Sequence, residues 1–271
     1  MPSSSPVHVT HALVLRVSDF GESDRVVTLL TEQHGKVSAL ARGAKSSRRR
    51  FGAALGLFGC GEAVLREKRD LWILEDLHST RGFVRLGQEL GRFSHACYAC
   101  ELSQHLCPPH APEPTIYRLL LELLDYLDRL PLSDRPAVEP LRSFELRLLD
   151  AVGLGISLNQ CATCGTDVPR ALYVPFDVVR GGVHCPDTCF GAPTPMELGL
   201  IFSGLSGGLP EAVRAALIAL AESRPDRQPT GISAAVLSAC RDVLLAVMRH
   251  HLGRDLRAVE FISKLNRSLL T

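Results

Sequence analysis

The chain has 271 residues, of which 46% are hydrophobic and 22% are charged, so it can bury a sizeable core and wholesale disorder is excluded. Its 30 basic residues nearly balance its 29 acidic ones. The resulting formal charge of +1 argues against a uniformly basic nucleic-acid binder and against an acidic tail protein. The length predicts one or two domains, or more if one of them is small.

The nine cysteines are an odd number, so they cannot all pair in disulfides. The start of the chain has no basic leader of the kind that precedes secretion, and no run of 18 apolar residues occurs. We therefore expect a soluble intracellular protein. In a reducing compartment its cysteines would be core residues, metal ligands or reactive thiols.

Short β-type segments open the chain and predict a small barrel or sandwich. These segments span residues 7–17, 25–31, 36–42, 62–68 and 71–77. In the first of them the alternation of apolar residues predicts one shared, buried face. The residues on that face are Val7, Val9, Leu13, Leu15 and Val17.

Helical periodicity replaces the strand pattern after Gly82. The apolar stripe of the first helix consists of Leu86, Leu90, Phe93, Cys97, Cys100, Gln104 and Cys107. Because Cys97 and Cys100 lie on this stripe, we interpret them as core residues rather than as a redox or metal pair, and we interpret Cys60 and Cys240 in the same way. Further helices are predicted after Pro114, after Pro140, at residues 210–222 and at residues 233–252.

This order predicts an α+β multidomain fold. Its segments are a β-barrel domain at residues 1–80, the first part of an α-helical domain at 81–155, a cysteine-rich insert at 156–190 and the second part of the helical domain at 191–271. The two helical stretches are expected to pack together, since neither alone offers much of a core.

Two cysteine pairs in the insert predict a metal site. Cys161 and Cys164 form a CxxC pair, and Cys185 and Cys189 form a CxxxC pair. Four thiolates can surround Zn²⁺ as a tetrahedron, and this closed shell leaves no position for a catalytic water. We predict one structural zinc ion per chain, with His184 as an alternative ligand in place of one cysteine. The competing interpretation is four free thiols in a loop.

A basic run, residues 36–50, lies within a stretch that has no acidic residue. Its cations are Lys36, Arg42, Lys45, Arg48, Arg49 and Arg50. Glycines and serines surround them, which predicts a flexible loop. On a small β barrel such a loop can follow the phosphates of single-stranded nucleic acid, with Phe51 available to stack on a base. The competing interpretation is a solvated loop without a partner.

Sequence patterns of catalysis do not support an enzyme. None of the ten histidines is followed two residues later by Glu, as a zinc deaminase would require, and HExxH is absent. We therefore predict a binding protein. Two alternatives are a zinc-containing protein-interaction or transcription-regulatory module, whose basic loop meets an acidic protein, and an unrecognised zinc enzyme acting on nucleic acid.

Several short segments follow one another in an order and spacing that are specific as a set. They are Ala12–Arg16, Gly21–Arg25, His34–Lys36, Ala41–Ala44, Arg50–Gly52, Phe144–Leu149, Cys161–Gly165, Gly181–Pro186 and His251–Leu256. Together they resemble the RecO family of recombination mediators. The resemblance implies an N-terminal OB-fold, a helical domain and a zinc-binding insert in a bacterial protein of the cytoplasm and nucleoid.

The resemblance also implies a function. Such proteins bind single- and double-stranded DNA, anneal complementary strands and, with RecR, help load RecA onto DNA coated by single-stranded DNA-binding protein (SSB). Their DNA contacts would fall here on the six cations of the basic run and Phe51. Their helical domain binds the acidic C-terminal tail of SSB. The cations that could pair with that tail are Arg241, Arg249, Arg254, Arg257, Lys264 and Arg267.

Overall fold

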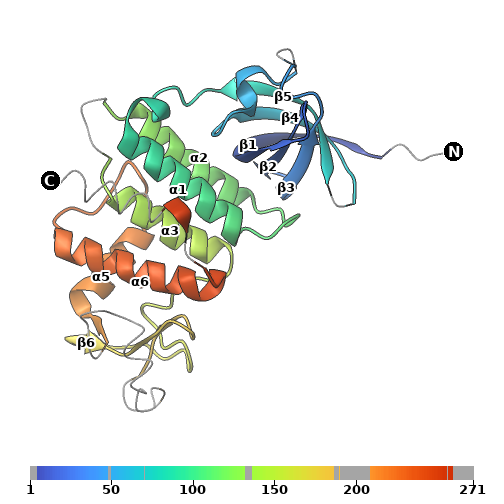
Figure 1. Ribbon diagram of the computed structural model, residues 1–271. Coiled ribbons are helices and arrows are strands. Elements are labelled where there is room, and N and C mark those ends of the chain that lie inside the picture. The colour runs from blue at the N-terminus through green and yellow to red at the C-terminus, as the bar shows by residue number, and fades with distance from the viewer. Residues whose placement is uncertain are drawn as a thin grey trace. The chain divides into compact units, whose positions relative to one another are not determined.

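In the computed structural model the chain forms two compact units (Figure 1). The first consists of Met1–Pro136 with Ala258–Thr271, and the second of Ala137–Arg257. The residues that the structure describes are 5–47, 50–69, 71–131, 136–185, 189, 208–254 and 256–258. No helix within these ranges is long and apolar enough to span a membrane.

Five strands at the start of the first unit form a closed barrel (Figure 1). They are β1 (Val7–Phe20), β2 (Asp24–Thr31), β3 (Gly35–Ala41), β4 (Cys60–Arg66) and β5 (Trp72–Arg81). The order around the barrel is β1-β2-β3-β5-β4, and only the β3–β5 pairing is parallel. This OB-like barrel confirms the predicted β-barrel domain, and the short helix η1 (Gly52–Leu55) lies between β3 and β4.

β1 does not bury the whole face that its alternation predicts. Ala12 and Val14 line the barrel core, whereas Val7 and Val9 are 46% and 55% exposed. The expectation for Val7 and Val9 was therefore wrong. Successive side chains point to opposite faces of a strand, so the odd-numbered residues before Val14 lie outside the barrel.

A β-bulge in β1 explains the remaining positions. The register with β2 shifts between Val14 and Arg16, and this extra residue returns Val17 to the side that packs against the barrel core. Leu13 and Leu15 are nevertheless buried, because helix α1 (Leu90–Leu106) packs against β1. A strand that is covered on both faces cannot be assigned an interior from alternation alone.

Two helices complete the described part of the first unit. α1 follows the short helix η2 (Leu86–Gln88), and α2 (Pro114–Arg129) packs against both α1 and β2. Glu89 caps α1 by accepting hydrogen bonds from the backbone N–H groups of Gly91 and Arg92. The guanidinium of Arg92 is buried and donates to the backbone carbonyls of Leu130 and Pro131, which joins the start of α1 to the end of α2.

The buried side of α1 differs from the predicted stripe. Leu90 and Phe93 are 50% and 37% exposed, although Cys100 is buried as expected. The buried side combines small residues with larger ones: Ser94, Ala96, Ala99, Cys100 and Ser103, with Arg92, His95, Tyr98, Leu102 and Leu106. Since alanine and serine contribute little to an apolar pattern, hydrophobic periodicity misplaces this face.

An aromatic cluster surrounds Trp72, the first residue of β5. The ring of Trp72 stacks with those of His8 and His110 at centroid distances of 5.3 and 5.8 Å, and His34 lies 5.3 Å from it. Burial lowers the pKa of His34, and the neighbouring His8 adds to this effect, although the charge of Glu67 opposes it. Burial at this position therefore favours the neutral imidazole of His34.

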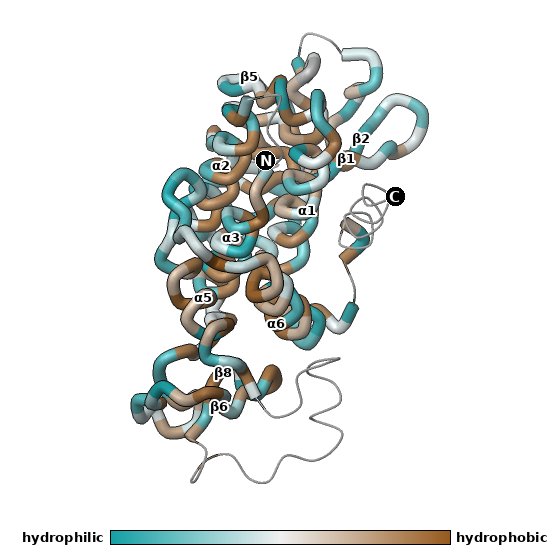
Figure 2. Tube along the Cα trace, turned by 90° about the vertical axis from the view of Figure 1, so that its left-hand side faces the viewer, coloured by the Kyte–Doolittle hydropathy of each residue, from teal (hydrophilic) through white to brown (hydrophobic). Residues whose placement is uncertain are grey.

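The described part of the second unit contains the helices α3 (Glu139–Ala151), α5 (Glu211–Ala221) and α6 (Ala234–Leu252). α3 packs against α5 and α6, so one helix before the cysteine-rich insert shares a core with two helices after it, whereas α1 and α2 belong to the first unit. α5 is apolar along most of its length, whereas α6 carries hydrophilic residues on one side (Figure 2).

The described part of the segment between α3 and α5 contains short strand pairs around a small core. β6 (Tyr173–Val174) pairs with β9 (Leu209–Pro210), and β7 (Phe176–Asp177) pairs with β8 (Gly182–Val183). Gly182 allows the chain to pass close to Ser157, because a Cβ atom at residue 182 would lie 2.4 Å from the Ser157 carbonyl oxygen. The bridge between Ser157 and Gly182 places the chain before Cys161 beside the strand that precedes Cys185.

Candidate metal centre and nucleic-acid interface

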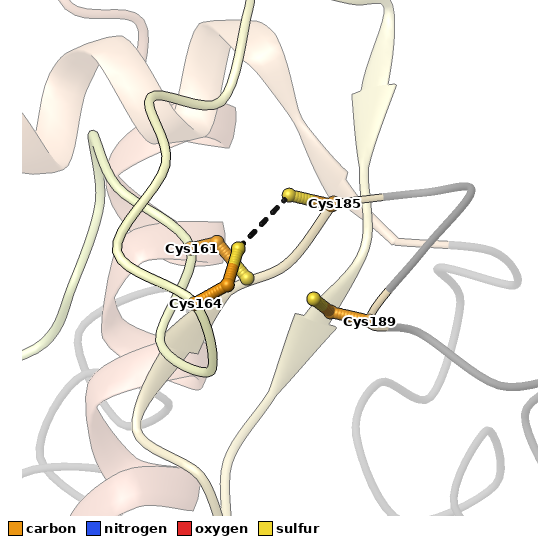
Figure 3. Close-up of side chains that lie close together, drawn as sticks. All are labelled: Cys161, Cys164, Cys185 and Cys189. Atoms are coloured by element: carbon orange, nitrogen blue, oxygen red, sulfur yellow. Dashed lines mark hydrogen bonds between the residues drawn. The ribbon is translucent and has the colours of Figure 1, made fainter.

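The four cysteines of the insert converge on one point (Figure 3). The sulfur atoms of Cys161, Cys164, Cys185 and Cys189 all lie within 4.8 Å of one another, and those of Cys164 and Cys185 are 3.6 Å apart. A tetrahedral zinc site with metal–sulfur bonds of about 2.3 Å has sulfur–sulfur edges of roughly 3.8 Å. The described geometry therefore fits a metal ion held by four thiolates.

Local backbone structure fixes the first cysteine pair. Cys161 begins a tight turn in which the N–H of Gly165 donates to the Cys161 carbonyl at 2.9 Å. Gly165 has φ +74°, a left-handed conformation that glycine adopts without strain. The N–H of Ala162 donates to the carbonyl of Val183 in β8, so the turn lies beside the strand that precedes Cys185.

Electrostatics at the site favour thiolates over thiols. Burial raises the pKa of Cys161, but N–H donors from Cys164, Cys185 and Thr163 outweigh it and lower the pKa to about 5. The pKa of Cys164 is lowered mainly by the hydroxyl and N–H of Thr166. Because metal ligation requires deprotonated sulfur, these donors prepare the site for a cation.

His184 lies beside the four sulfurs but is not one of the converging ligands. Its side chain is buried, with Nδ1 3.1 Å from the Thr163 hydroxyl and 3.9 Å from the Cys161 sulfur. The group that could hold a metal consists of the four cysteines. The CxxxC spacing of the second pair therefore still delivers both of its sulfurs to the site.

The remaining five cysteines have a different environment. Burial raises the pKa of Cys97 and Cys107 to about 11 and that of Cys240 to about 12, and it also raises those of Cys60 and Cys100. Among the described residues, the insert cysteines form the one group that could hold a metal. The five others are protonated packing residues, in agreement with the interpretation from sequence.

A buried arginine that sequence reasoning missed holds the metal-site loop. Arg214 in α5 is 4% exposed, and its guanidinium donates to the carbonyls of Leu158, Val168 and Pro169 at 2.7, 2.8 and 3.1 Å. These carbonyls lie on both sides of the first cysteine pair. The available signal was a single arginine in the otherwise apolar stretch that follows Glu211.

Replacing Arg214 by Ala is expected to lower the stability of the insert by about 3 kcal/mol, because three buried carbonyls lose their donor. Metal bound at the cysteines should then pass to a chromogenic chelator faster than in the parent protein. Arg170→Ala is the matched control, since the Arg170 side chain is 91% exposed and pairs at 3.7 Å with Glu211, the first residue of α5. Equal transfer rates in both variants would refute the anchoring role.

The basic run forms an ordered turn in its described part. Gly43 has φ +63°, and the N–H groups of Ser46 and Ser47 donate to its carbonyl. Arg50 returns to the turn by donating to the carbonyl of Arg42 at 2.7 Å and to the Ser47 hydroxyl at 3.2 Å. The described residues therefore form a loop whose shape is held by these hydrogen bonds. Arg48 and Arg49 lie outside the described residues.

Three of the predicted DNA contacts are exposed and two predictions are corrected. Arg42, Lys45 and Arg50 are exposed on the turn. Lys36 instead points inward, where its Nζ donates to the carbonyl of Gln104 at 2.6 Å and burial lowers its pKa. Phe51 is 2% exposed and belongs to the barrel core, so its ring is not available to stack on a base.

The predicted partner-tail cations are exposed wherever the structure describes them: Arg241, Arg249, Arg254 and Arg257. Arg241 forms an ion pair with Asp242 at 2.8 Å and donates to the Ser238 hydroxyl. Lys264 and Arg267 lie outside the described residues.

Comparison with known proteins agrees with this architecture. Residues 6–83 match the family described as Recombination protein O N terminal, and residues 87–201 match Recombination protein O C terminal. A DNA repair protein RecO from Anaeromyxobacter sp. (strain K) is 43% identical over 260 residues, which cover 93% of this chain and 94% of the relative. One from Myxococcus xanthus (strain DK1622) is 34% identical over 257 residues, which cover 93% and 96%. The chain therefore belongs to the RecO family of DNA repair proteins.

Proposed function

We propose that this chain is a non-catalytic recombination mediator that binds single- and double-stranded DNA and anneals complementary strands. With RecR, it would help load RecA onto DNA coated by SSB, within the bacterial cytoplasm and nucleoid. Family membership supports the repair role. The observation that carries the DNA-binding proposal is the exposed cationic turn of Arg42, Lys45 and Arg50 on an OB-like barrel.

The mechanism requires only binding and alignment. Cations on the turn would hold one strand by its phosphates, without reading sequence, and would leave the bases free to pair with a second strand. The cations of α6 and the residues after it, Arg241, Arg249, Arg254 and Arg257, would hold the acidic tail of SSB and so deliver the mediator to coated DNA. No covalent step or nucleotide hydrolysis is involved.

We further propose that the ion at the four cysteines is Zn²⁺ and that its role is structural. The donor set supports this assignment, since four soft thiolates suit zinc and close its coordination shell. When bound, zinc would cross-link the two cysteine-containing segments of the insert. The cysteines, their N–H donors and Arg214 would then keep the insert folded.

The DNA-binding proposal is tested by replacing the cations of the turn with neutral polar side chains. A triple variant, Arg42→Gln, Lys45→Gln and Arg50→Gln, should bind a labelled oligo(dT) roughly a hundredfold more weakly near 0.1 M salt. The slope of log affinity against log salt should also fall by about 2, at roughly 0.7 for each phosphate contact. Fluorescence anisotropy over a salt series measures both.

A matched control removes three exposed charges elsewhere. Arg118, Arg129 and Arg170 have side chains that are 71%, 81% and 91% exposed, and their triple Gln variant changes net charge by the same amount. If both triple variants lose affinity equally, the turn is not the DNA site. If the parent binds no DNA in any salt, a zinc-containing protein-interaction module replaces the mediator as the better function.

A further inference from the structure

An acidic residue lies at the base of the proposed DNA-binding turn. One carboxylate oxygen of Asp24, the first residue of β2, accepts hydrogen bonds from the N–H of Gly43 at 2.7 Å and from the Ser23 hydroxyl at 2.9 Å. These two donors, Gly43 first, lower the pKa of Asp24. Asp24 is therefore a carboxylate at neutral pH.

Further bonds join the same two turns. The N–H of Lys45 donates to the carbonyl of Ser23 at 3.0 Å, and its Nζ donates to the carbonyl of Gly21 at 3.1 Å. The ammonium group also lies 3.3 Å from the Asp19 carboxylate. The turn between β1 and β2 and the cationic turn after β3 thus form one bonded unit.

The Asp24 contact acts on the peptide that controls the shape of the cationic turn. Gly43 adopts φ +63°, and its carbonyl accepts from Ser46 and Ser47 while its N–H donates to Asp24. Hydrogen bonds therefore fix both the N–H and the carbonyl of Gly43. Arg42 precedes Gly43 directly, and its carbonyl receives the Arg50 guanidinium, so the position of Gly43 sets where both cations lie.

We propose that Asp24 is a positioning residue for polyanion binding: its carboxylate holds the turn at Gly43 so that Arg42, Lys45 and Arg50 present their charges together. This inference rests on the proposed function of the turn. It predicts that removing the Asp24 carboxylate weakens polyanion binding, which is the opposite of what the loss of one negative charge alone would do. A carboxylate beside bound phosphates repels them, so removing it would strengthen binding if charge were its whole contribution.

Asp24→Ala is expected to weaken binding of labelled oligo(dT) about tenfold and to reduce the salt slope, because cations that are no longer held together contact fewer phosphates. Asp24→Asn keeps an acceptor for the Gly43 N–H and should restore affinity to at least the parent value. Glu22→Gln is the matched control, since Glu22 is exposed in the same turn, and it should leave affinity unchanged or slightly higher. Asp24→Ala binding as tightly as the parent would overturn the proposal.

Two further measurements keep the test decisive. Asp24→Glu keeps the charge but displaces the acceptor by one methylene group, so it should weaken DNA binding. Parent-like affinity in this variant would also overturn the positioning role. This measurement decides the question even if Asp24→Ala does not fold. If the triple Gln variant of the turn leaves DNA binding unchanged, the proposed function of this site fails. If the triple variant weakens binding but Asp24→Ala does not, only the positioning role fails.

Discussion

Cys161→Ser should abolish metal binding and unfold the insert. A structural zinc ion contributes on the order of 10 kcal/mol to small modules of this kind, more than the roughly 3 kcal/mol expected from the contacts of Arg214. The strand pairs of the insert are two residues long, and its buried apolar residues are few: Leu158, Val168, Val174, Phe176, Val178 and Val183. Without the ion, conformational entropy exceeds what this small core can supply.

Elemental analysis of protein purified without a chelator measures the metal, and limited proteolysis measures the fold. The parent should contain one zinc per chain, and the variant none, with cleavage concentrated within residues 156–190. Cys97→Ser is the matched control, because Cys97 lies outside the converging group and should leave metal content unchanged. A parent protein that contains neither zinc nor iron would refute the metal site, whereas iron in place of zinc would refute only the identity of the ion.

Gly35→Ala is expected to destabilise the first unit by about 3–4 kcal/mol, through backbone strain and a lost contact. Gly35 has φ +64°, and a Cβ atom there would lie 2.1 Å from the carbonyl oxygen of Ala111. The backbone after α1 would have to move away. That movement would break the hydrogen bond from the His110 N–H to the Lys36 carbonyl and separate His110 from Trp72.

Gly21→Ala separates the backbone strain from the effect of the close contact with Ala111. Gly21 has φ +60° but nothing within 4 Å of its added Cβ atom, so this variant carries only the left-handed backbone penalty of about 1 kcal/mol. Urea unfolding gives the free energies. Trp72 is the only tryptophan, so its emission reports directly on the His110 contact. Equal destabilisation by the two substitutions would contradict the close approach at Ala111.

The strands, the helices and the metal-site cysteines could be predicted from local sequence. The five strands and the helices α5 and α6 lie within a few residues of the predicted ranges, because turn residues and periodicity mark their limits. The two cysteine pairs were recognisable because metal ligation requires thiols at short spacing. Each of these signals is contained in a short stretch of chain.

The direction of individual side chains could not be predicted in this way. Lys36 and Phe51 belong to the same basic, glycine-rich stretch as Arg42, yet Lys36 is half-buried with its Nζ bonded to the carbonyl of Gln104, and Phe51 is buried. Their positions depend on α1 and on the barrel core, which distant parts of the chain supply. The contacts of Asp24 with Gly43 and of Arg214 with Leu158 join residues that are 19 and 56 positions apart.

The sequence by itself determined the order of a β barrel, helices and a four-cysteine insert, and it contained the segments that mark the RecO family. Only the tertiary structure decided which face of β1 is interior, which cations of the basic run remain exposed and which side chains hold the two proposed sites in shape. The physical reason is that periodicity and spacing record what each segment requires, whereas burial and hydrogen bonding depend on what the rest of the fold places against it.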